Sequence, residues 1–289
     1  MTNHDTRQQF LFDGTDIRGE ITSLSSSYKA IVNQQQYPET VATLFGQFLV
    51  AASLLSARLK YSGIVTIQAM GSGALTTVMA ECAEGSKLRG IVRGEFNGLN
   101  KAHKLSDFLG SATLAITIEP ENGERYQGIV PMDADNLSDC LEHYFNQSEQ
   151  LPTQIKISAD TNIASGVMVQ QMPSRQAQEK TTADWAHVAS LMKTLQPEEQ
   201  LTLSHIDQLY RLFHEEGVRV FEPKDLHFFC SCSRHRTERA LLSIGQEEVI
   251  DIYKQEGVVA ITCEFCAEQY HFDKKQIDAM FKGEKSLLH

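Results

Sequence analysis

One long apolar run near the start of the chain has the period of a helix. Its hydrophobic positions recur at steps of three and four residues and cover almost every side, so we expect a deeply buried helix. Pro38 begins the run, at a first-turn position that proline tolerates. The apolar positions are Val41, Leu44, Phe45, Phe48, Leu49, Ala52, Leu55 and Leu59.

Shorter apolar runs on both sides of this helix are typical of strands. Turns that contain glycine separate them, such as Gly71-Ser-Gly73 and Asn122-Gly123. The runs follow one another closely, which favours antiparallel pairing over β-α-β crossovers, and Asn136–Phe145 has the pattern of a further helix. We predict an α+β domain over residues 1–175, with mainly antiparallel strands around the long buried helix. The predicted strands are Arg18–Leu24, Ile64–Met70, Leu75–Cys82, Leu88–Arg93, Ala112–Ile118, Tyr126–Val130, Gln154–Ser158 and Val167–Gln171.

Residues 176–225 have a different pattern and form a predicted helical linker. One apolar stripe runs from Trp185 to Leu195 and ends at Pro197, and a second stripe ends at Gly217. Helices this short are marginal without tertiary packing, so they must dock on a neighbour. The pattern fits permanent packing as well as it fits helices that detach when the neighbour moves. The second stripe consists of Ile206, Leu209, Tyr210 and Phe213.

The last segment, residues 226–289, carries two cysteine pairs with thirty residues between them, Cys230-Ser-Cys232 and Cys263-Glu-Phe-Cys266. Residues two apart in an extended chain point to the same side, and the second spacing fits a tight turn. Two such pairs are the arrangement that four tetrahedral Zn²⁺ bonds require. We therefore predict a small zinc-binding domain with one Zn²⁺ per chain. Its predicted elements are a helix over Glu238–Ile244, a strand over Val258–Thr262 and a helix over Lys274–Phe281.

The other potential ligands and thiols near this pattern have simpler explanations. His227, His235 and His271 lie close to the cysteines, but four sulfurs already complete the coordination sphere. Cys82 and Cys140 lie in apolar runs, where a cysteine is usually a small buried hydrophobe.

The composition indicates the cellular compartment in which the protein acts. The chain has 6 Cys in 289 residues, and no apolar leader follows Met1. No run reaches the roughly 18 apolar residues of a membrane span. We therefore expect a cytoplasmic protein without membrane association, in which thiols stay reduced and a cysteine cluster indicates metal or redox chemistry.

Charge bears on the most common role of zinc ribbons, which is nucleic-acid binding. The formal net charge is −11, and residues 221–289 hold 9 Lys and Arg against 12 Asp and Glu. Nucleic-acid modules carry a basic face, so no nucleic-acid partner is expected. Arg234, Arg236 and Arg239 form a local basic run that keeps a zinc-ribbon module with purely structural zinc as the alternative.

The chemistry of four thiolates adds a further possibility. Metal binding keeps each sulfur deprotonated, and a thiolate is the form that peroxide and hypochlorous acid attack. A segment of about sixty residues has a small core that often needs a bound metal or disulfides to stay folded, so loss of the metal should unfold it. The Cys₄ site is closed, unlike a catalytic zinc site, and the common phosphate-loop and hydrolase motifs are absent. We expect no enzyme, although a metalloenzyme or thiol oxidoreductase is a third hypothesis.

Several segments, spread over almost the whole chain, resemble the 33 kDa chaperonin family of redox-regulated heat-shock chaperones. They occur in the family's order, and all four positions of its cysteine quartet match. The segments are Ile17-Arg-Gly-Glu, Leu44-Phe-Gly-Gln-Phe-Leu, the stretch from Met132-Asp-Ala-Asp to Leu-Pro-Thr153, Cys230-Ser-Cys-Ser-Arg-His-Arg-Thr-Glu-Arg and Thr262-Cys-Glu-Phe-Cys-Ala-Glu-Gln-Tyr-His-Phe.

The resemblance implies an ATP-independent holdase that is inactive while it is reduced and binds zinc. In such a protein, oxidants together with heat release the zinc and form the disulfides Cys230–Cys232 and Cys263–Cys266. The zinc domain and the linker then unfold, the protein forms a homodimer, and it holds unfolding client proteins until reductants return.

Overall fold

The computed structural model describes residues 4–57, 62–173 and 178–286 and divides the chain into two compact units. The first unit comprises Met1–Phe229 and the second Cys230–His289. Both combine helices with mainly antiparallel strands, which confirms the predicted α+β class. The segment predicted as a linker, residues 176–225, is counted within the first unit.

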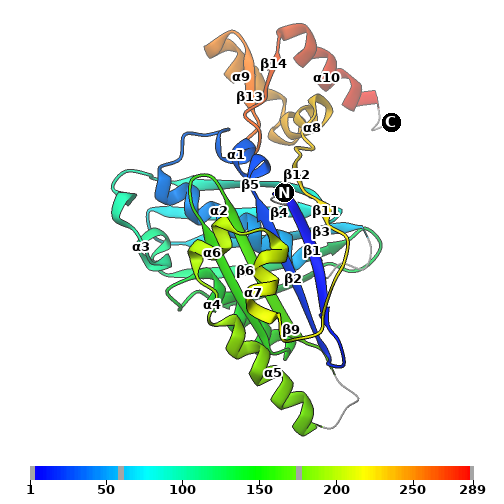
Figure 1. Ribbon diagram of the computed structural model, residues 1–289. Helices are drawn as coiled ribbons and strands as arrows, with labels where there is room; N and C mark the ends of the chain where they lie inside the picture. The colour runs from blue at the N-terminus through cyan, green and yellow to red at the C-terminus, as the bar shows by residue number, and fades with distance from the viewer. Residues whose placement is uncertain (1–3, 58–61, 174–177, 287–289) are drawn as a thin grey trace. The chain divides into compact units, whose positions relative to one another are not determined.

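The first sheet of the first unit has six strands in the order β10-β1-β2-β9-β8, with β11 also paired to β1 (Figure 1). Every pair in it is antiparallel. The strands are β1 (Thr6–Phe12), β2 (Ile17–Leu24), β8 (Thr153–Ala159), β9 (Ala164–Gln171), β10 (Val218–Val220) and β11 (Lys224–Asp225).

The second sheet has the order β12-β5-β4-β3-β6-β7. Its neighbours are antiparallel except for the short parallel pair of β12 and β5. All eight predicted strands are therefore present, with antiparallel pairing as expected. The strands are β3 (Gly63–Gly71), β4 (Leu75–Ala83), β5 (Lys87–Gly94), β6 (Ala112–Pro120), β7 (Tyr126–Pro131) and β12 (His227–Phe228).

The long apolar helix is α2 (Glu39–Ser56), which contacts strands of both sheets. By length and composition it could cross a membrane, but 78% of it is buried, as in the core helix of a folded domain. Leu59, predicted on the same stripe, lies outside the described residues. The shorter helices are α1 (Ser26–Val32), a 3-10 turn (Leu99–Lys101), α3 (Leu105–Leu109) and α4 (Leu137–Tyr144), which continues as a π-helical turn (Phe145–Glu149).

Three helices cover the face of the first sheet opposite to α2 (Figure 1). They are α5 (Gln178–Met192), α6 (Pro197–Thr202) and α7 (His205–Phe213). Pro197 both follows the first predicted helix and begins α6, which the sequence pattern missed. The apolar contact, called here the linker core, joins side chains of the sheet and of α5 and α7. Its buried members are Phe10, Phe12, Ile17, Ile21, Val167, Val169, Val188, Met192, Leu195, Leu209, Leu212 and Phe213.

The predicted stripe of α7 is partly wrong. Leu209 and Phe213 are buried, but Ile206 and Tyr210 are 51% and 69% exposed. The buried face instead includes His205 and other polar side chains that hydrogen-bond to the sheet or to neighbouring turns. Hydrogen bonding has therefore overridden the hydrophobic pattern here.

Over its described residues, 230–286, the second unit consists of three helices and one β-hairpin. Six apolar side chains form its buried core, namely Leu241, Val249, Val259, Phe272, Ile277 and Phe281. The prediction missed α9 and β14, whose sequences are mostly polar. The elements are α8 (Arg234–Ile244), α9 (Gln246–Glu256), β13 (Val259–Thr262), β14 (Gln269–Phe272) and α10 (Lys274–Ser286).

Candidate metal centre

The four cysteines of the second unit lie together. Their Sγ atoms are all within 4.8 Å of one another, and each side chain is half-buried. The Sγ atoms of Cys230 and Cys263 are 3.7 Å apart, and those of Cys232 and Cys266 are 3.3 Å apart. None of the four is in a disulfide. The two pairs therefore meet as one cluster of free thiols.

The second pair lies in the turn that joins β13 to β14. The amide of Ala267 donates to the carbonyl of Cys263 at 2.8 Å, and the amide of Cys263 donates to the carbonyl of Glu268 at 2.8 Å. Ala267 has a φ of 56°, a left-handed conformation that tightens the turn. These bonds aim both sulfurs of the pair to the same side, as its spacing predicted.

The first pair lies in the irregular segment just before α8. Ser233 caps this helix by accepting a hydrogen bond from the amide of Arg236. The guanidinium of Arg236 also donates to the hydroxyl of Ser231 at 2.6 Å, between the two cysteines. The helix start and this contact fix the backbone that presents Cys230 and Cys232.

The basic residues of α8 have specific partners. Arg234 donates to the carbonyl of His271 at 3.1 Å and lies 4.4 Å from the ring centre of Phe272. It also forms a surface ion pair with Glu238. Two arginines of the predicted basic run, Arg234 and Arg236, are thus engaged within the second unit.

Burial and hydrogen bonds shift the pKa values of Cys230, Cys232 and Cys266 in different directions. The hydroxyl of Tyr270 donates to Cys232 Sγ at 3.2 Å. Burial opposes ionisation of Cys232, but this bond and bonds from the other three thiols lower its pKa below the ordinary value. Burial raises the pKa of Cys230 and of Cys266. The sequence did not single out Tyr270, because only the fold of the hairpin brings β14 to the first cysteine pair.

The cluster fits a tetrahedral metal ion of the zinc type. Zn–S bonds of about 2.3 Å place tetrahedral sulfurs roughly 3.8 Å apart. The Sγ separation of Cys230 and Cys263, 3.7 Å, is close to this distance, and that of Cys232 and Cys266, 3.3 Å, is shorter. Four thiolates are a soft donor set that selects zinc or iron–sulfur over magnesium or calcium. Among the described residues, the group contains these four cysteines and no histidine.

The other two cysteines lie elsewhere. Cys82, on β4, and Cys140, on α4, are both fully buried in the core of the first unit, and burial raises the pKa of each thiol. Their predicted role as buried small hydrophobes agrees with this position.

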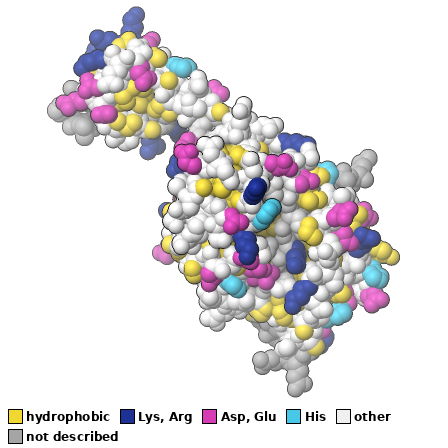
Figure 2. All heavy atoms as spheres, turned by 90° about the vertical axis from the view of Figure 1, so that its left-hand side faces the viewer, with side chains coloured by type: hydrophobic (Ala, Val, Ile, Leu, Met, Phe, Trp, Pro, Cys, Tyr) yellow, Lys and Arg dark blue, Asp and Glu magenta, His cyan; other side chains and the backbone are white. Residues whose placement is uncertain are grey.

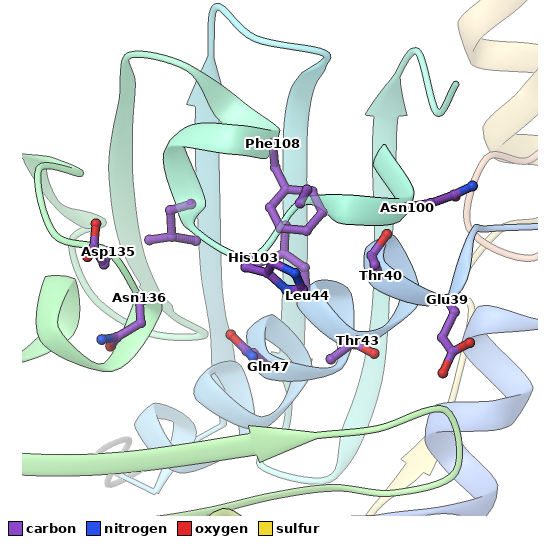
Figure 3. A pocket seen from close by; sticks show the side chains of 12 residues that line it. Glu39, Thr40, Thr43, Leu44, Gln47, Asn100, His103, Phe108, Asp135 and Asn136 are labelled. Atoms are coloured by element: carbon purple, nitrogen blue, oxygen red, sulfur yellow. The ribbon is translucent and has the colours of Figure 1, made fainter. Parts of the chain in front are cut away.

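The first unit also contains an open cavity of about 440 Å³ (Figure 3). Thr43 and Gln47 of α2 line it together with His103, and Leu44 and Phe108 supply apolar contacts. It contains none of the four clustered cysteines. On the face that Figure 2 shows, acidic and basic side chains are interspersed over the first unit.

A family model described as Hsp33 protein matches residues 5–273. The chain belongs to the Hsp33 family.

The sequences of its relatives match this chain along almost their full length. The 33 kDa chaperonins of Pseudomonas paraeruginosa and Azotobacter vinelandii are each 41% identical over 286 residues, which cover 98% of this chain and 96% of each relative. That of Ectopseudomonas mendocina is 42% identical over 283 residues, which cover 97% of this chain and 96% of the relative.

A solved member has the same fold. The crystal structure of the 33 kDa chaperonin (heat shock protein 33 homolog) from Thermotoga maritima matches with a TM-score of 0.84 and 22% identity, over 98% of this chain and all of that one. The fold of this chain is therefore that of the solved Thermotoga maritima protein.

Proposed function

We propose that this Hsp33-family chain is a redox-regulated, ATP-independent chaperone that holds unfolding proteins. The observation that carries the proposal is the cluster of four free thiols in a unit with a small core. Membership of a family whose curated members are named 33 kDa chaperonin supports it.

In this proposal Cys230, Cys232, Cys263 and Cys266 hold one Zn²⁺ per chain. When bound, the ion holds the two cysteine pairs together and keeps their sulfurs as thiolates. Structural zinc contributes on the order of 10–16 kcal/mol to small modules, against roughly 5–15 kcal/mol of net stability for a whole domain. The second unit, with a core of six buried apolar side chains among its described residues, then depends on the cysteine cluster for its fold.

Oxidation removes this support. A thiolate attacks hydrogen peroxide, the O–O bond breaks, and the sulfur becomes a sulfenic acid. A second thiolate displaces the sulfenic oxygen, so that one S–S bond forms. For each disulfide, two thiolates, one peroxide and two protons yield two water molecules. The disulfides proposed from the family are Cys230–Cys232 and Cys263–Cys266, which leave no thiolate for the ion.

Unfolding of the second unit is proposed to release the helices of residues 176–225 from the first sheet. Those helices cover the apolar face of the first sheet, including Phe10, Ile21 and Val169. Their release would expose contiguous apolar surface, the property that recognises unfolding proteins. We further propose that the oxidised protein is a homodimer, that it acts in the cytoplasm, and that it has no enzymatic activity and no nucleic-acid or membrane partner.

The test follows zinc and chaperone activity in the same sample. Reduced, zinc-loaded protein is treated with hydrogen peroxide at raised temperature, while a chromogenic chelator records zinc release. Samples are then tested for their ability to slow aggregation of a chemically unfolded protein. We expect both signals to rise together. Oxidised, zinc-free protein that leaves aggregation unchanged would refute the function.

A second arm addresses the alternative of a zinc ribbon with structural zinc. Binding of the reduced protein to single- and double-stranded DNA and to RNA is measured at low and moderate salt. A ribbon module would bind with an affinity that falls steeply with salt. We expect no such binding, because the chain carries a formal charge of −11.

A further inference from the structure

Groups outside the cluster donate hydrogen bonds of two kinds to its sulfurs. Main-chain amides supply one kind, from Cys232 to the sulfur of Cys230 and from Glu268 to the sulfur of Cys266. The bond to Cys232 from Tyr270 is of the other kind, because it comes from a side-chain hydroxyl, at 3.2 Å. The backbone of the turn fixes a main-chain donor whatever its side chain is. A side-chain donor depends on the identity of one residue, and a substitution of that residue removes it.

The position of Tyr270 is held from several sides. It lies on β14 opposite Ile261 of β13, and its ring packs against the core of the second unit. Phe272, on the same strand, is fully buried and has Arg234 against its ring. The hydroxyl therefore stays directed at Cys232 for as long as the hairpin is intact.

We propose that Tyr270 is a positioning residue that shields Cys232 Sγ and so limits how fast the cysteine cluster is oxidised. The inference rests on the proposed redox function and adds a residue to it. A sulfur lone pair that accepts a hydrogen bond is less available to attack peroxide, so that bond must weaken before the S–O bond can form. Outer hydrogen bonds of this kind tune metal–thiolate sites.

The chain offers a conservative variant and a matched control. Tyr270→Phe removes the hydroxyl and leaves the ring in place. Tyr253→Phe makes the same change on α9, where the ring also packs against the core of the second unit. Both variants are prepared as full-length, reduced and zinc-loaded protein, and their zinc content is compared with that of the unaltered chain.

Two rates of zinc release are then measured. In one, hydrogen peroxide drives release; in the other, a strong chelator does so without oxidant. We expect peroxide-driven release to be on the order of 10-fold faster in Tyr270→Phe, with a clearly smaller change in chelator-driven release. Tyr253→Phe should match the unaltered chain in both. Brief peroxide treatment followed by alkylation and peptide mass spectrometry should find Cys232 oxidised earlier in Tyr270→Phe.

Three results would overturn the inference. The first is an unchanged peroxide rate in Tyr270→Phe. The second is a chelator rate that rises as much as the peroxide rate, because the hydroxyl would then only stabilise the fold. The third is a reduced Tyr270→Phe protein that holds no zinc. An unaltered chain that binds no zinc would refute the proposed function itself, which is a different outcome.

Discussion

The Nε2 atom of His205 lies 2.8 Å from the hydroxyl of Ser23, and both side chains are buried between α7 and the first sheet. The Nδ1 atom of the same ring lies 2.9 Å from Gln8 Oε1, whose amide nitrogen donates to the carbonyl of Phe221. The partners of the imidazole are thus neutral. Burial, with a smaller contribution from nearby His4, lowers the pKa of His205 to about 4.

This site predicts that acid weakens the docking of α7. The pKa of His205 is lower in the folded state than the ordinary 6.5, so its stabilising contribution is complete above pH 6.5 and is lost as the pH falls towards 4. The loss amounts to at most about 3 kcal/mol over that range. Urea unfolding, followed by fluorescence of Trp185 on α5, checks it between pH 7 and 4.5. His205→Gln should remove this contribution and leave the opposite slope of Glu20, and an unaltered slope in that variant would contradict the assignment.

Glu20 predicts a pH dependence of opposite sign. It lies on the α2 face of the first sheet, where burial raises its pKa to about 7 although Arg7 lies 3.9 Å away. Because the folded-state pKa is raised, its contribution is complete below pH 4.5 and is lost as the pH rises through 7. Glu20→Gln should therefore remove a decrease in unfolding free energy between pH 4.5 and 7.5. Equal slopes in the variant and the unaltered chain would disprove this.

The effects of Glu20 and His205 overlap between pH 4.5 and 6.5 and partly cancel. Each single variant should reveal the slope that the other residue produces. The double variant should be nearly independent of pH in this window as far as these two groups are concerned, and denaturant titrations of all four proteins check this.

Two aromatic residues of α7 provide a matched pair for testing the linker core. Phe213 is buried with its ring centre 4.9 Å from that of Phe12, whereas Tyr210 is 69% exposed. Phe213→Ala should lower the stability of helix docking by about 3–5 kcal/mol, and Tyr210→Ala should change it little. Limited proteolysis of the reduced proteins measures this. Under the proposed function, Phe213→Ala should also slow client aggregation without oxidant; equal protection of the helices in both variants would be inconsistent with this packing.

Substitution of a cysteine in each unit should show which cysteines hold the metal. Cys230→Ser removes one of four sulfurs and should reduce bound zinc to a small fraction of one equivalent, with loss of helical signal from α8 to α10. Cys82→Ser, at a buried thiol of the first unit, should keep its zinc. Atomic absorption and circular dichroism provide both readouts. Full zinc content in Cys230→Ser would mean that the cluster is not the metal site.

Eight strands of the first unit and α2 could be predicted because their apolar positions keep a regular period, whereas β1 and the short strands β10, β11 and β12 were not predicted. The helix α9 could not, because only Val249 along it is fully buried. The face of α7 was assigned wrongly because His205 and Gln208 are buried by hydrogen bonding, which a hydrophobic pattern does not record.

The cysteine cluster could be predicted for a different reason. Cysteine spacing within each pair depends on local backbone geometry alone, so the sequence contains it directly. The contact of Tyr270 with Cys232 spans 38 residues and depends on the path of the chain between them. Such a contact has no local signal.

Hydrogen–deuterium exchange of the full chain, before and after peroxide removes zinc, tests the central claim most directly. The account predicts that amides of residues 230–286 lose protection as zinc leaves and that those of residues 178–213 follow. The two sheets of the first unit should keep most of theirs. Protection of residues 230–286 that persists in the oxidised, zinc-free protein would contradict the account.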